Sequence, residues 1–251
     1  MAPTHDQVRV RLIQIRVRPD ILDEEQASFA ARTRLRRPQI LSSNAVRDPL
    51  TEDLLDDVDA VLIGGAGAYS VTHTYSWTDD LIQLCQGCAE RRLPLFGSCW
   101  GHQFIARAFG GVVVNDPTRV EMGTLPATLT AAGRQDPLFA PFPKTFYAQM
   151  GHHDRVATLP EHAVELATSE VAPHQAFRLG DLPIYGTQFH SELDRAAEEG
   201  RLRAYREHYP EMADDDVFQD TIDALRETPD VDNLLYHFVK LYAVEDGAQA
   251  A

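Results

Sequence analysis

Short apolar runs alternate with longer segments of helical spacing through the first hundred residues. The runs are typical of buried β-strands and cover residues 8–15, 39–44, 58–63 and 95–96. Apolar residues recur at helical spacing over 23–36 and 78–92, and one or two helical turns are expected at 51–55. Asp23 is a candidate N-cap of the first helix. Strands that alternate with helices predict a mostly parallel sheet flanked by helices.

After Gly110-Gly111 the pattern changes to short β-type segments separated by turn residues. These segments cover residues 112–115, 124–130, 145–150, 164–168, 175–179 and 184–189. They predict a smaller antiparallel or mixed sheet region attached to the parallel core. From Asp194 the spacing becomes helical, over residues 196–208, 216–226 and 232–244. The tail 247–251 is expected to fray.

The expected fold class is therefore α/β, with the domain over residues 8–193. Residues 194–251 are expected to form a helical C-terminal extension packed on the same domain.

Composition and charge narrow the choice of partners. The 251 residues include 44% hydrophobic and 24% charged residues, which are ordinary values for a globular protein. A formal net charge of −15 argues against nucleic acid or an anionic membrane as the partner, since either needs a basic surface. No secretory signal or membrane-length apolar run is visible, and three cysteines fit a reducing compartment. These features predict a cytoplasmic protein.

One segment combines a strand, a sharp turn and a helix around a cysteine. Gly97-Ser98-Cys99-Trp100-Gly101 follows the strand at 95–96 and leads into a helical pattern through Arg107. Glycines that flank a nucleophile let the backbone turn sharply and expose one side chain above the sheet. A nearby helix N-terminus favours a thiolate and an incoming oxyanion. The alternative is an inert buried cysteine beside two chance glycines.

A thiol nucleophile needs a base and a group that orients the base. His190 and Glu192 follow the strand at 184–189, and residues two apart in an extended segment point the same way. A tetrahedral oxyanion also needs N–H donors, for which the backbone amides of Trp100 and Gly65 are candidates. The alternatives are a solvated His-x-Glu loop and a phosphate cradle at 64–67, although that glycine spacing matches no phosphate-binding motif.

Two further groups of residues could carry chemistry. His152, His153 and Asp154 could ligate a metal, but neighbouring strand positions face opposite sides and no partner motif exists elsewhere. Hydrogen bonding to substrate, or plain loop structure, is favoured there. Cys85 and Cys88 have the spacing of a redox motif within a helical pattern, where core packing is favoured.

The assembled motifs resemble those of the class I (triad) glutamine amidotransferases. Residues 97–103 resemble the nucleophile motif Gly-x-Cys-x-Gly-x-Gln, and residues 185–192 resemble the closing motif Tyr-Gly-x-Gln-Phe-His-Pro-Glu. Gly64-Gly65 with Ser70-Val71 resembles the family's oxyanion strand and loop. Residues 151–156 resemble the Ser-His-Gly-Asp-x-Val segment of the amidotransferase half of GMP synthetase. The resemblance covers residues 8–192.

The resemblance implies a role for each matching residue. Cys99 would be the nucleophile, His190 the general base and acid, and Glu192 the residue that orients His190. The amides of Gly65 and Trp100 would form the oxyanion hole. Substrate-binding residues are implied at Gln103, His152, His153 and Asp154. No cofactor and no metal is implied.

The sequence also departs from the family pattern. Ser191 replaces the usual proline, Gly151 replaces the usual serine, and the loop from Gly64 to Val71 is longer than usual. Residues after Glu192 have no counterpart in the minimal domain. A Ser-Gly-Gly-x-Asp-Ser pyrophosphatase loop is missing, so the chain lacks a synthase half of the GMP synthetase type.

Together these features predict a cysteine-dependent glutaminase that hydrolyses the γ-carboxamide of L-glutamine through a thioester. The ammonia would pass to a partner synthase. One alternative is a stand-alone hydrolase of γ-glutamyl peptides or conjugates. Another is a non-enzymatic binding module that keeps the fold, because fold alone does not establish activity.

Overall fold

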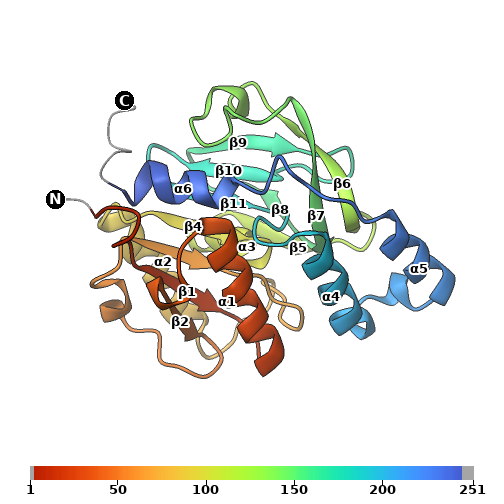
Figure 1. Cartoon of the computed structure of the whole chain (residues 1–251), viewed down its shortest axis with the longest axis horizontal. Helices are drawn as coiled ribbons and strands as arrows, with labels where there is room; N and C mark the ends of the chain where they lie inside the picture. Colours follow the sequence, from red (N-terminus) through yellow and green to blue (C-terminus); the bar gives the residue numbers. More distant parts are fainter. Residues whose placement is uncertain (1–2, 245–251) are drawn as a thin grey trace.

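The computed structural model describes residues 3–244, in which a nine-stranded sheet runs through the molecule in the order β2-β1-β3-β4-β11-β10-β9-β6-β7 (Figure 1). The strands of the first half are β1 (Val10–Gln14), β2 (Ile40–Asn44), β3 (Ala60–Ile63) and β4 (Leu95–Ser98). Those of the second half are β6 (Glu121–Leu129), β7 (Thr145–His152), β9 (Ala163–Thr168), β10 (Ala176–Leu179) and β11 (Ile184–Thr187). The expected α/β class is confirmed.

The five strands from β2 to β11 are parallel, and the remaining pairs are antiparallel. β11 belongs to both halves, because it pairs in parallel with β4 and antiparallel with β10. Its register places Gly186 beside Gly97 and Thr187 beside Ser98. The β-rich second half therefore continues the parallel sheet, and the segments that follow β4 and β11 leave the sheet side by side.

A separate two-stranded sheet pairs β5 (Val112–Asn115) with β8 (Asp154–Thr158). β5 lies where the sequence predicts it. β8 is not among the predicted strands, because its first residues read as part of a polar loop. This pairing fixes the start of β8 next to Asn115.

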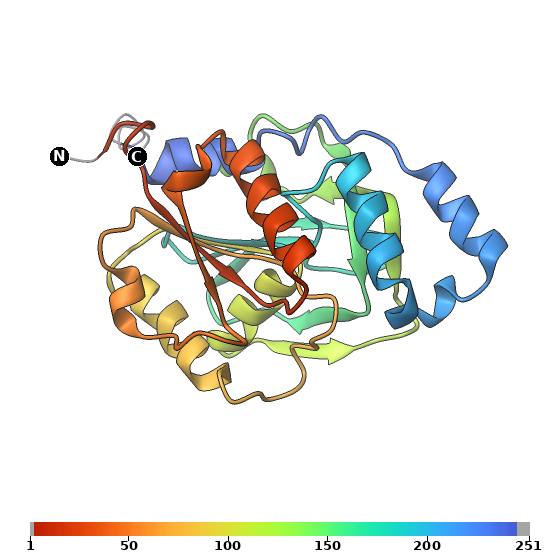
Figure 2. The same ribbon diagram turned by 60° about the horizontal axis from the view of Figure 1, so that its bottom comes forward.

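Helices cover both faces of the large sheet (Figure 2). α1 (Pro19–Thr33) and α6 (Leu234–Tyr242) pack on one face through Phe29 and Phe238. α2 (Thr78–Glu90) and α3 (Trp100–Ala108) pack on the other face through Leu81 and Phe104. Side chains alternate between the faces of a strand, so β1, β3, β4 and β11 contribute to both cores.

The predicted N-cap of the first helix is wrong. α1 begins at Pro19 with Arg18 as its N-cap, one turn before Asp23. Proline suits the first helical position because its φ is already helical and its missing N–H would have no partner there. Asp23 instead forms a surface ion pair with Arg37.

The C-terminal segment forms α4 (Arg195–Tyr205) and α5 (Asp215–Ala224) before α6, with two short 3₁₀ turns between α4 and α5. The carboxylate of Asp194 caps α4 by accepting from the Ala197 amide at 2.8 Å. α4 lies beside α1, and Arg201 forms an ion pair with Glu24 across them (Figure 1). The predicted fraying of residues 247–251 falls outside the described residues.

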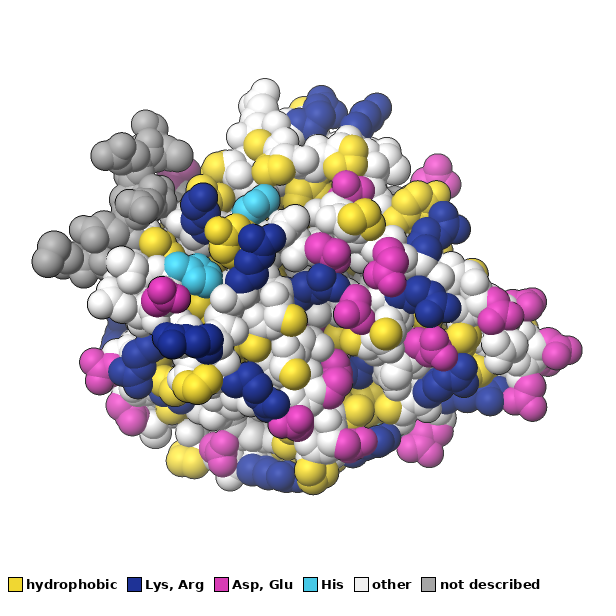
Figure 3. Space-filling model, in the orientation of Figure 1, with side chains coloured by type: hydrophobic (Ala, Val, Ile, Leu, Met, Phe, Trp, Pro, Cys, Tyr) yellow, Lys and Arg dark blue, Asp and Glu magenta, His cyan; other side chains and the backbone are white. Residues whose placement is uncertain are grey.

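The surface agrees with the acidic composition. Figure 3 shows Asp and Glu side chains gathered at the α5 end of the molecule, with Arg and Lys scattered over the α1 side. Within residues 3–244, no helix combines the length and apolar character needed to cross a bilayer.

Candidate active site

Cys99 stands at the turn between β4 and α3. Its backbone has φ 51° and ψ −102°, a left-handed φ that a residue with a side chain adopts only under strain. The flanking glycines allow this turn. A Cβ on Gly97 would lie 2.4 Å from the carbonyl carbon of Gly101, and a Cβ on Gly101 would lie 2.3 Å from the Ile63 oxygen. The close approach of these backbones explains why both positions are glycine.

His190 and Glu192 lie together next to this turn, as the sequence predicts. His190 Nδ1 is 2.9 Å from Glu192 Oε1, and both residues are buried. The backbone of His190 is fixed to β7, because its amide donates to the Gln149 carbonyl at 2.9 Å. The same contact brings the end of β7, with Gly151 and His152, up to the cysteine.

Ser98 also holds Glu192 in position through a hydrogen bond. The sequence did not indicate this role. The Ser98 hydroxyl donates to Glu192 Oε2 at 2.5 Å and accepts from the Ser191 amide at 3.2 Å. The Ser191 hydroxyl pairs with that of Thr187 at 2.6 Å, a contact that the family's usual proline would lack. The signal for Ser98 that the sequence offers is a hydroxyl next to Cys99 on a buried strand.

The charges in this group shift its pKa values. Burial alone would lower the pKa of His190, but its electrostatic and hydrogen-bonding interactions with Cys99 and Glu192 outweigh burial and raise that pKa well above its usual range. Burial would raise the pKa of Glu192, but His190 and the Ser98 hydroxyl lower it to about 2. Glu192 is therefore a carboxylate at neutral pH, and it favours an imidazolium at His190.

The two predicted oxyanion donors border Cys99. A Cβ on Gly65 would lie 3.3 Å from His190 Cε1 and 3.9 Å from Cys99 Cβ. Trp100 is the first residue of α3, so its N–H has no acceptor within the helix. The positive end of the helix dipole adds to the attraction for an anion at this position.

A buried ion pair between Arg16 and Glu25 lies next to the Gly64-Gly65 segment. Arg16 Nε donates to Glu25 Oε1 at 2.8 Å, and Arg16 Nη1 donates to the Tyr205 hydroxyl at 3.1 Å. A Cβ on Gly64 would lie 2.7 Å from Glu25 Oε1. Sequence reasoning missed this pair, because an arginine after a strand and a glutamate in a helix carry no sign that they are buried.

A cavity of about 250 Å³ opens above Cys99. It is lined by Cys99, Trp100 and Gln103, by loop residues 66–70, and by residues 151–154. His208 and Tyr209 of the C-terminal segment complete its wall. Such a volume suits an amino-acid-sized ligand, with Cys99 at its boundary.

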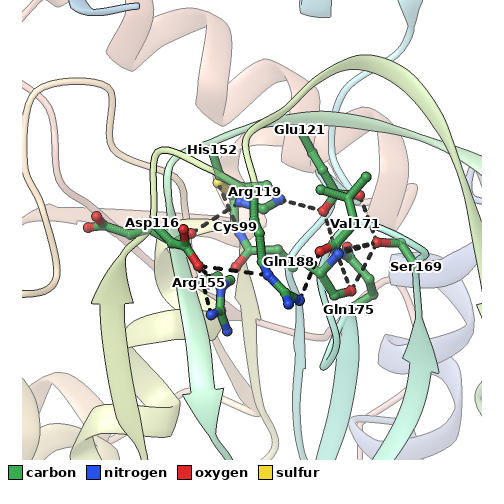
Figure 4. A network of polar contacts seen from close by, with 12 residues as sticks. Cys99, Asp116, Arg119, Glu121, His152, Arg155, Ser169, Val171, Gln175 and Gln188 are labelled. Atoms are coloured by element: carbon green, nitrogen blue, oxygen red, sulfur yellow. Dashed lines mark hydrogen bonds and ion pairs between the residues drawn. The ribbon is translucent and has the colours of Figure 1, made fainter.

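The 151–154 segment carries a buried polar network along this cavity (Figure 4). His152 Nε2 is 3.1 Å from Glu121 Oε2, and His152 Nδ1 is 3.1 Å from the Asp154 carbonyl. Glu121 also accepts from Gln175 at 2.6 Å and from Ser169 at 2.7 Å. This network fixes the His152 ring beside the cavity.

The other predicted substrate-binding residues have partners of their own. The Asp154 carboxylate accepts from the Ser70 hydroxyl at 2.5 Å and from Asn115 Nδ2 at 2.9 Å, which ties the 66–70 loop to β8. Gln103 Nε2 donates to the Asp154 carbonyl at 2.6 Å. His153 Nε2 is 2.6 Å from Glu211 Oε1. Among residues 3–244 no three or more His, Cys, Asp or Glu side chains are grouped as a metal site.

The remaining cysteines lie away from the cavity. Cys85 and Cys88 are free thiols buried in the core between α2 and the sheet. Burial raises the pKa of Cys88 to about 12 and raises that of Cys85 as well. Both thiols are therefore protonated and unreactive at neutral pH, in contrast to a nucleophile.

Comparison with known proteins identifies the family of the chain. The family described as Glutamine amidotransferase class-I matches residues 30–203. A glutamine-hydrolyzing GMP synthase subunit from Pyrococcus abyssi is 32% identical over 139 residues, covering 55% of this chain and 71% of that protein. The corresponding subunit from Methanocaldococcus jannaschii is 37% identical over 116 residues, covering 45% and 60%. For the GMP synthase of Thermosipho africanus, 42% identity over 104 residues spans only 19% of that protein.

Solved structures show the same fold. A glutamine amidotransferase from Methylobacillus flagellatus has a TM-score of 0.68 at 20% identity, covering 97% of this chain and 98% of that one. Another, from Thermotoga maritima, has a TM-score of 0.65 at 21% identity, covering 94% and 98%. With the family match extending over most of the chain, the protein belongs to the class I glutamine amidotransferases.

Proposed function

We propose that the protein hydrolyses the γ-carboxamide of L-glutamine through a thioester on Cys99. The observation that carries this proposal is the arrangement of Cys99 on a strained turn, beside a histidine held at 2.9 Å by a buried carboxylate. The cavity of about 250 Å³ above the thiol leaves space for a small substrate such as glutamine.

In the first half of the reaction, the Cys99 thiolate attacks the γ-carbonyl carbon and a C–S bond forms. The carbonyl oxygen becomes an oxyanion, which the amides of Gly65 and Trp100 stabilise. His190, as an imidazolium, gives its proton to the amide nitrogen. The C–N bond then breaks, and ammonia leaves behind a glutamyl thioester.

In the second half, neutral His190 takes a proton from water, and the resulting hydroxide attacks the thioester. The C–S bond breaks, glutamate is released, and the thiolate and imidazolium are restored. Glu192 holds the His190 ring in one orientation and stabilises its charged form throughout. Gln103, His152, His153 and Asp154 are proposed to bind the substrate from the cavity wall. None of these steps needs a cofactor.

Ammonia release by the purified protein tests this proposal. With L-glutamine as substrate, the wild type should form equal amounts of ammonia and glutamate, and the Cys99→Ala variant should form none above background. A Cys85→Ala variant is the matched control and should keep its activity. Wild-type protein that is inert to glutamine and to γ-glutamyl peptides would overturn the proposal, and a non-enzymatic binding module would replace it.

We further propose that a partner synthase accepts the ammonia, because the relatives above are glutamine-hydrolyzing GMP synthases or their subunits. The second candidate is a stand-alone hydrolase of γ-glutamyl peptides or conjugates. It is favoured by His208 and Tyr209, two residues of the C-terminal segment that line the cavity above Cys99. Steady turnover of a γ-glutamyl peptide by the isolated chain supports the stand-alone enzyme. Stimulation of glutaminase activity by an added synthase supports the partnership.

The division into residues 8–193 and 194–251 stays a prediction, as does the cytoplasmic location. The packing of α6 into the same core as α1 and the sheet supports the expectation that the extension belongs to the main domain.

A further inference from the structure

Glu198 is a buried carboxylate that the reaction above does not use. It lies in the first turn of α4 and is 1% exposed. Its Oε2 atom has no hydrogen-bond partner among residues 3–244. The next residue, Glu199, has the ordinary surface role and forms ion pairs with Arg195 and Arg203. A buried acceptor left unpaired is costly, so Glu198 calls for a function.

The position of Glu198 relates it directly to the proposed site. A Cβ on Gly151 would lie 3.7 Å from Glu198 Oε1 and 3.9 Å from His190 Nε2. The carboxyl group and the histidine therefore border the same small space, which a side chain at position 151 would enter. Gly151 itself lines the cavity above Cys99. Glycine at this position thus leaves room between the cavity and Glu198.

The charges around Glu198 leave it without a direct cationic partner. Burial raises its pKa to about 7; His190 and Arg201 act to lower that pKa, and Glu192 and Glu24 act to raise it. Arg201 forms its ion pair with Glu24, with Nε donating to Oε2 at 2.6 Å, and among residues 3–244 no ion pair joins it to Glu198. A cationic ligand group beside Glu198 would stabilise its ionised form and satisfy the unpaired oxygen.

We propose that Glu198 binds the α-ammonium group of the substrate. It would take the place of the serine side chain that is usual in the family at the position of Gly151. This assignment rests on the proposed hydrolysis of a glutamine-type amide. The α-nitrogen of glutamine is four bonds from the γ-carbonyl carbon, about 5 Å in an extended chain. The space beside Glu198 also borders His190 Nε2 and meets the cavity above Cys99 at Gly151, so the α-ammonium of a substrate attached at Cys99 would extend toward it. The α4 helix would then determine specificity for a free α-amino group.

The proposal distinguishes between substrates with the same reactive amide. L-Glutamine and γ-glutamyl amides carry an α-ammonium, whereas glutaramate (5-amino-5-oxopentanoate) has the same γ-carboxamide and carboxylate without it. Wild-type protein should favour glutamine over glutaramate in kcat/KM by about 10- to 100-fold, the range of a buried charge-assisted hydrogen bond.

The Glu198→Gln variant should lose this preference. We expect its kcat/KM for glutamine to fall by about 10- to 100-fold, mainly through KM, with less than about a threefold change for glutaramate. Glu199→Gln, on the same helix, is the matched control and should behave as wild type. Because a Cβ at 151 meets Glu198 only at ordinary contact distance, Gly151→Ser combined with Glu198→Gln should recover part of the affinity for glutamine.

Binding to the Cys99→Ala protein separates this proposal from the proposed reaction, because it needs no turnover. Calorimetry should show tighter binding of glutamine than of glutaramate, and the difference should vanish when Glu198→Gln is added. If the wild type has no activity but this difference is present, hydrolysis is overturned and recognition by Glu198 stands.

Two results would overturn the role of Glu198 and leave hydrolysis in place. The first is an equal fall for both substrates in Glu198→Gln, which would indicate a structural role or an effect on His190. The second is a wild-type enzyme that does not distinguish glutamine from glutaramate. This second test needs only the wild-type protein, so it can be made even if the Glu198→Gln variant does not fold.

Discussion

Two buried histidines in neighbouring parts of the molecule show how the surroundings decide what a side chain can do. His190 follows β11 and has Glu192 at 2.9 Å, and its pKa is raised well above the usual range. His102 lies in α3, one turn beyond Cys99, and packs against Gly186 and Phe177. Burial lowers the pKa of His102 to about 3. Both rings are buried, yet one carries a proton at neutral pH and the other does not.

The difference comes from a partner of opposite charge. Burial acts to lower the pKa of both rings, but only His190 has a carboxylate and a thiol that outweigh it. His102, although it follows Cys99 by three residues, is therefore a core residue, and His190 is the histidine proposed to carry the proton.

Removing the Glu192 carboxylate should have the largest effect on the difference between His190 and His102. In Glu192→Gln the negative charge is lost, so the pKa of His190 should fall and its ring should lose the preferred tautomer. We expect kcat to fall by about 10³-fold or more, as when the acid of a catalytic triad is replaced by its amide. The kcat–pH profile should shift together with the loss of rate. A variant with wild-type kcat would contradict the assignment of Glu192.

His102 should make the fold sensitive to acid. Its pKa is about 3 in the folded protein and near 6.5 when unfolded, so between these values the unfolded state binds more protons. Its contribution to stability is therefore complete above pH 6.5 and is lost, by about 1.4 kcal/mol per unit, as the pH falls toward 3.

Urea unfolding between pH 7 and pH 4 measures this slope. His102→Leu should unfold with a free energy that depends less on pH, even if packing costs lower its absolute value. The exposed His73 provides the control, and His73→Leu should keep the wild-type slope. Equal slopes in wild type and His102→Leu would show that His102 is not the group responsible.

Ser98 should have a smaller effect, because it acts on His190 only through Glu192. Ser98→Ala removes the 2.5 Å hydrogen bond to Glu192 Oε2 and leaves the 2.9 Å contact with His190 in place. We expect kcat to fall by about 10-fold with little change in KM, the scale of one hydrogen bond to a charged group. Ser191→Ala, which removes a hydroxyl paired with Thr187 instead, should cost less. A larger fall in kcat for Ser191→Ala than for Ser98→Ala would show that Glu192 is held in position mainly by the turn at Ser191.

The sequence predicted the candidate site best where its residues lie close together in short contiguous motifs. The turn at Cys99 and the His190–Glu192 pair could be predicted because glycine spacing and strand alternation describe local geometry. Most strands could be predicted for the same reason, since they are short apolar runs bounded by turns. The strand order could not, because β11 lies beside β4 although some ninety residues separate them.

Residues whose role depends on burial were missed. Arg16, Glu25 and Glu198 have the composition of a solvated surface, and only the packing of α1 and α4 against the site shows otherwise. The N-cap at Asp23 was wrong because Pro19 starts the helix one turn earlier. For the three buried residues, contacts between distant segments outweighed the local signal, whereas at Asp23 one local signal outweighed another.

The pairing of β11 with β4 has a consequence for how activity can be lost. Cys99 and His190 leave adjacent strands, and the Cys99 amide donates to the Thr187 carbonyl at 2.8 Å, so the register of one ladder sets the distance between them. A slip of one residue would turn every side chain to the opposite face. We therefore expect no partly active form of the protein in which Cys99 and His190 are slightly misaligned. The active fraction of a preparation should equal its folded fraction, and remote destabilising mutations should reduce the number of working molecules rather than their individual turnover rate.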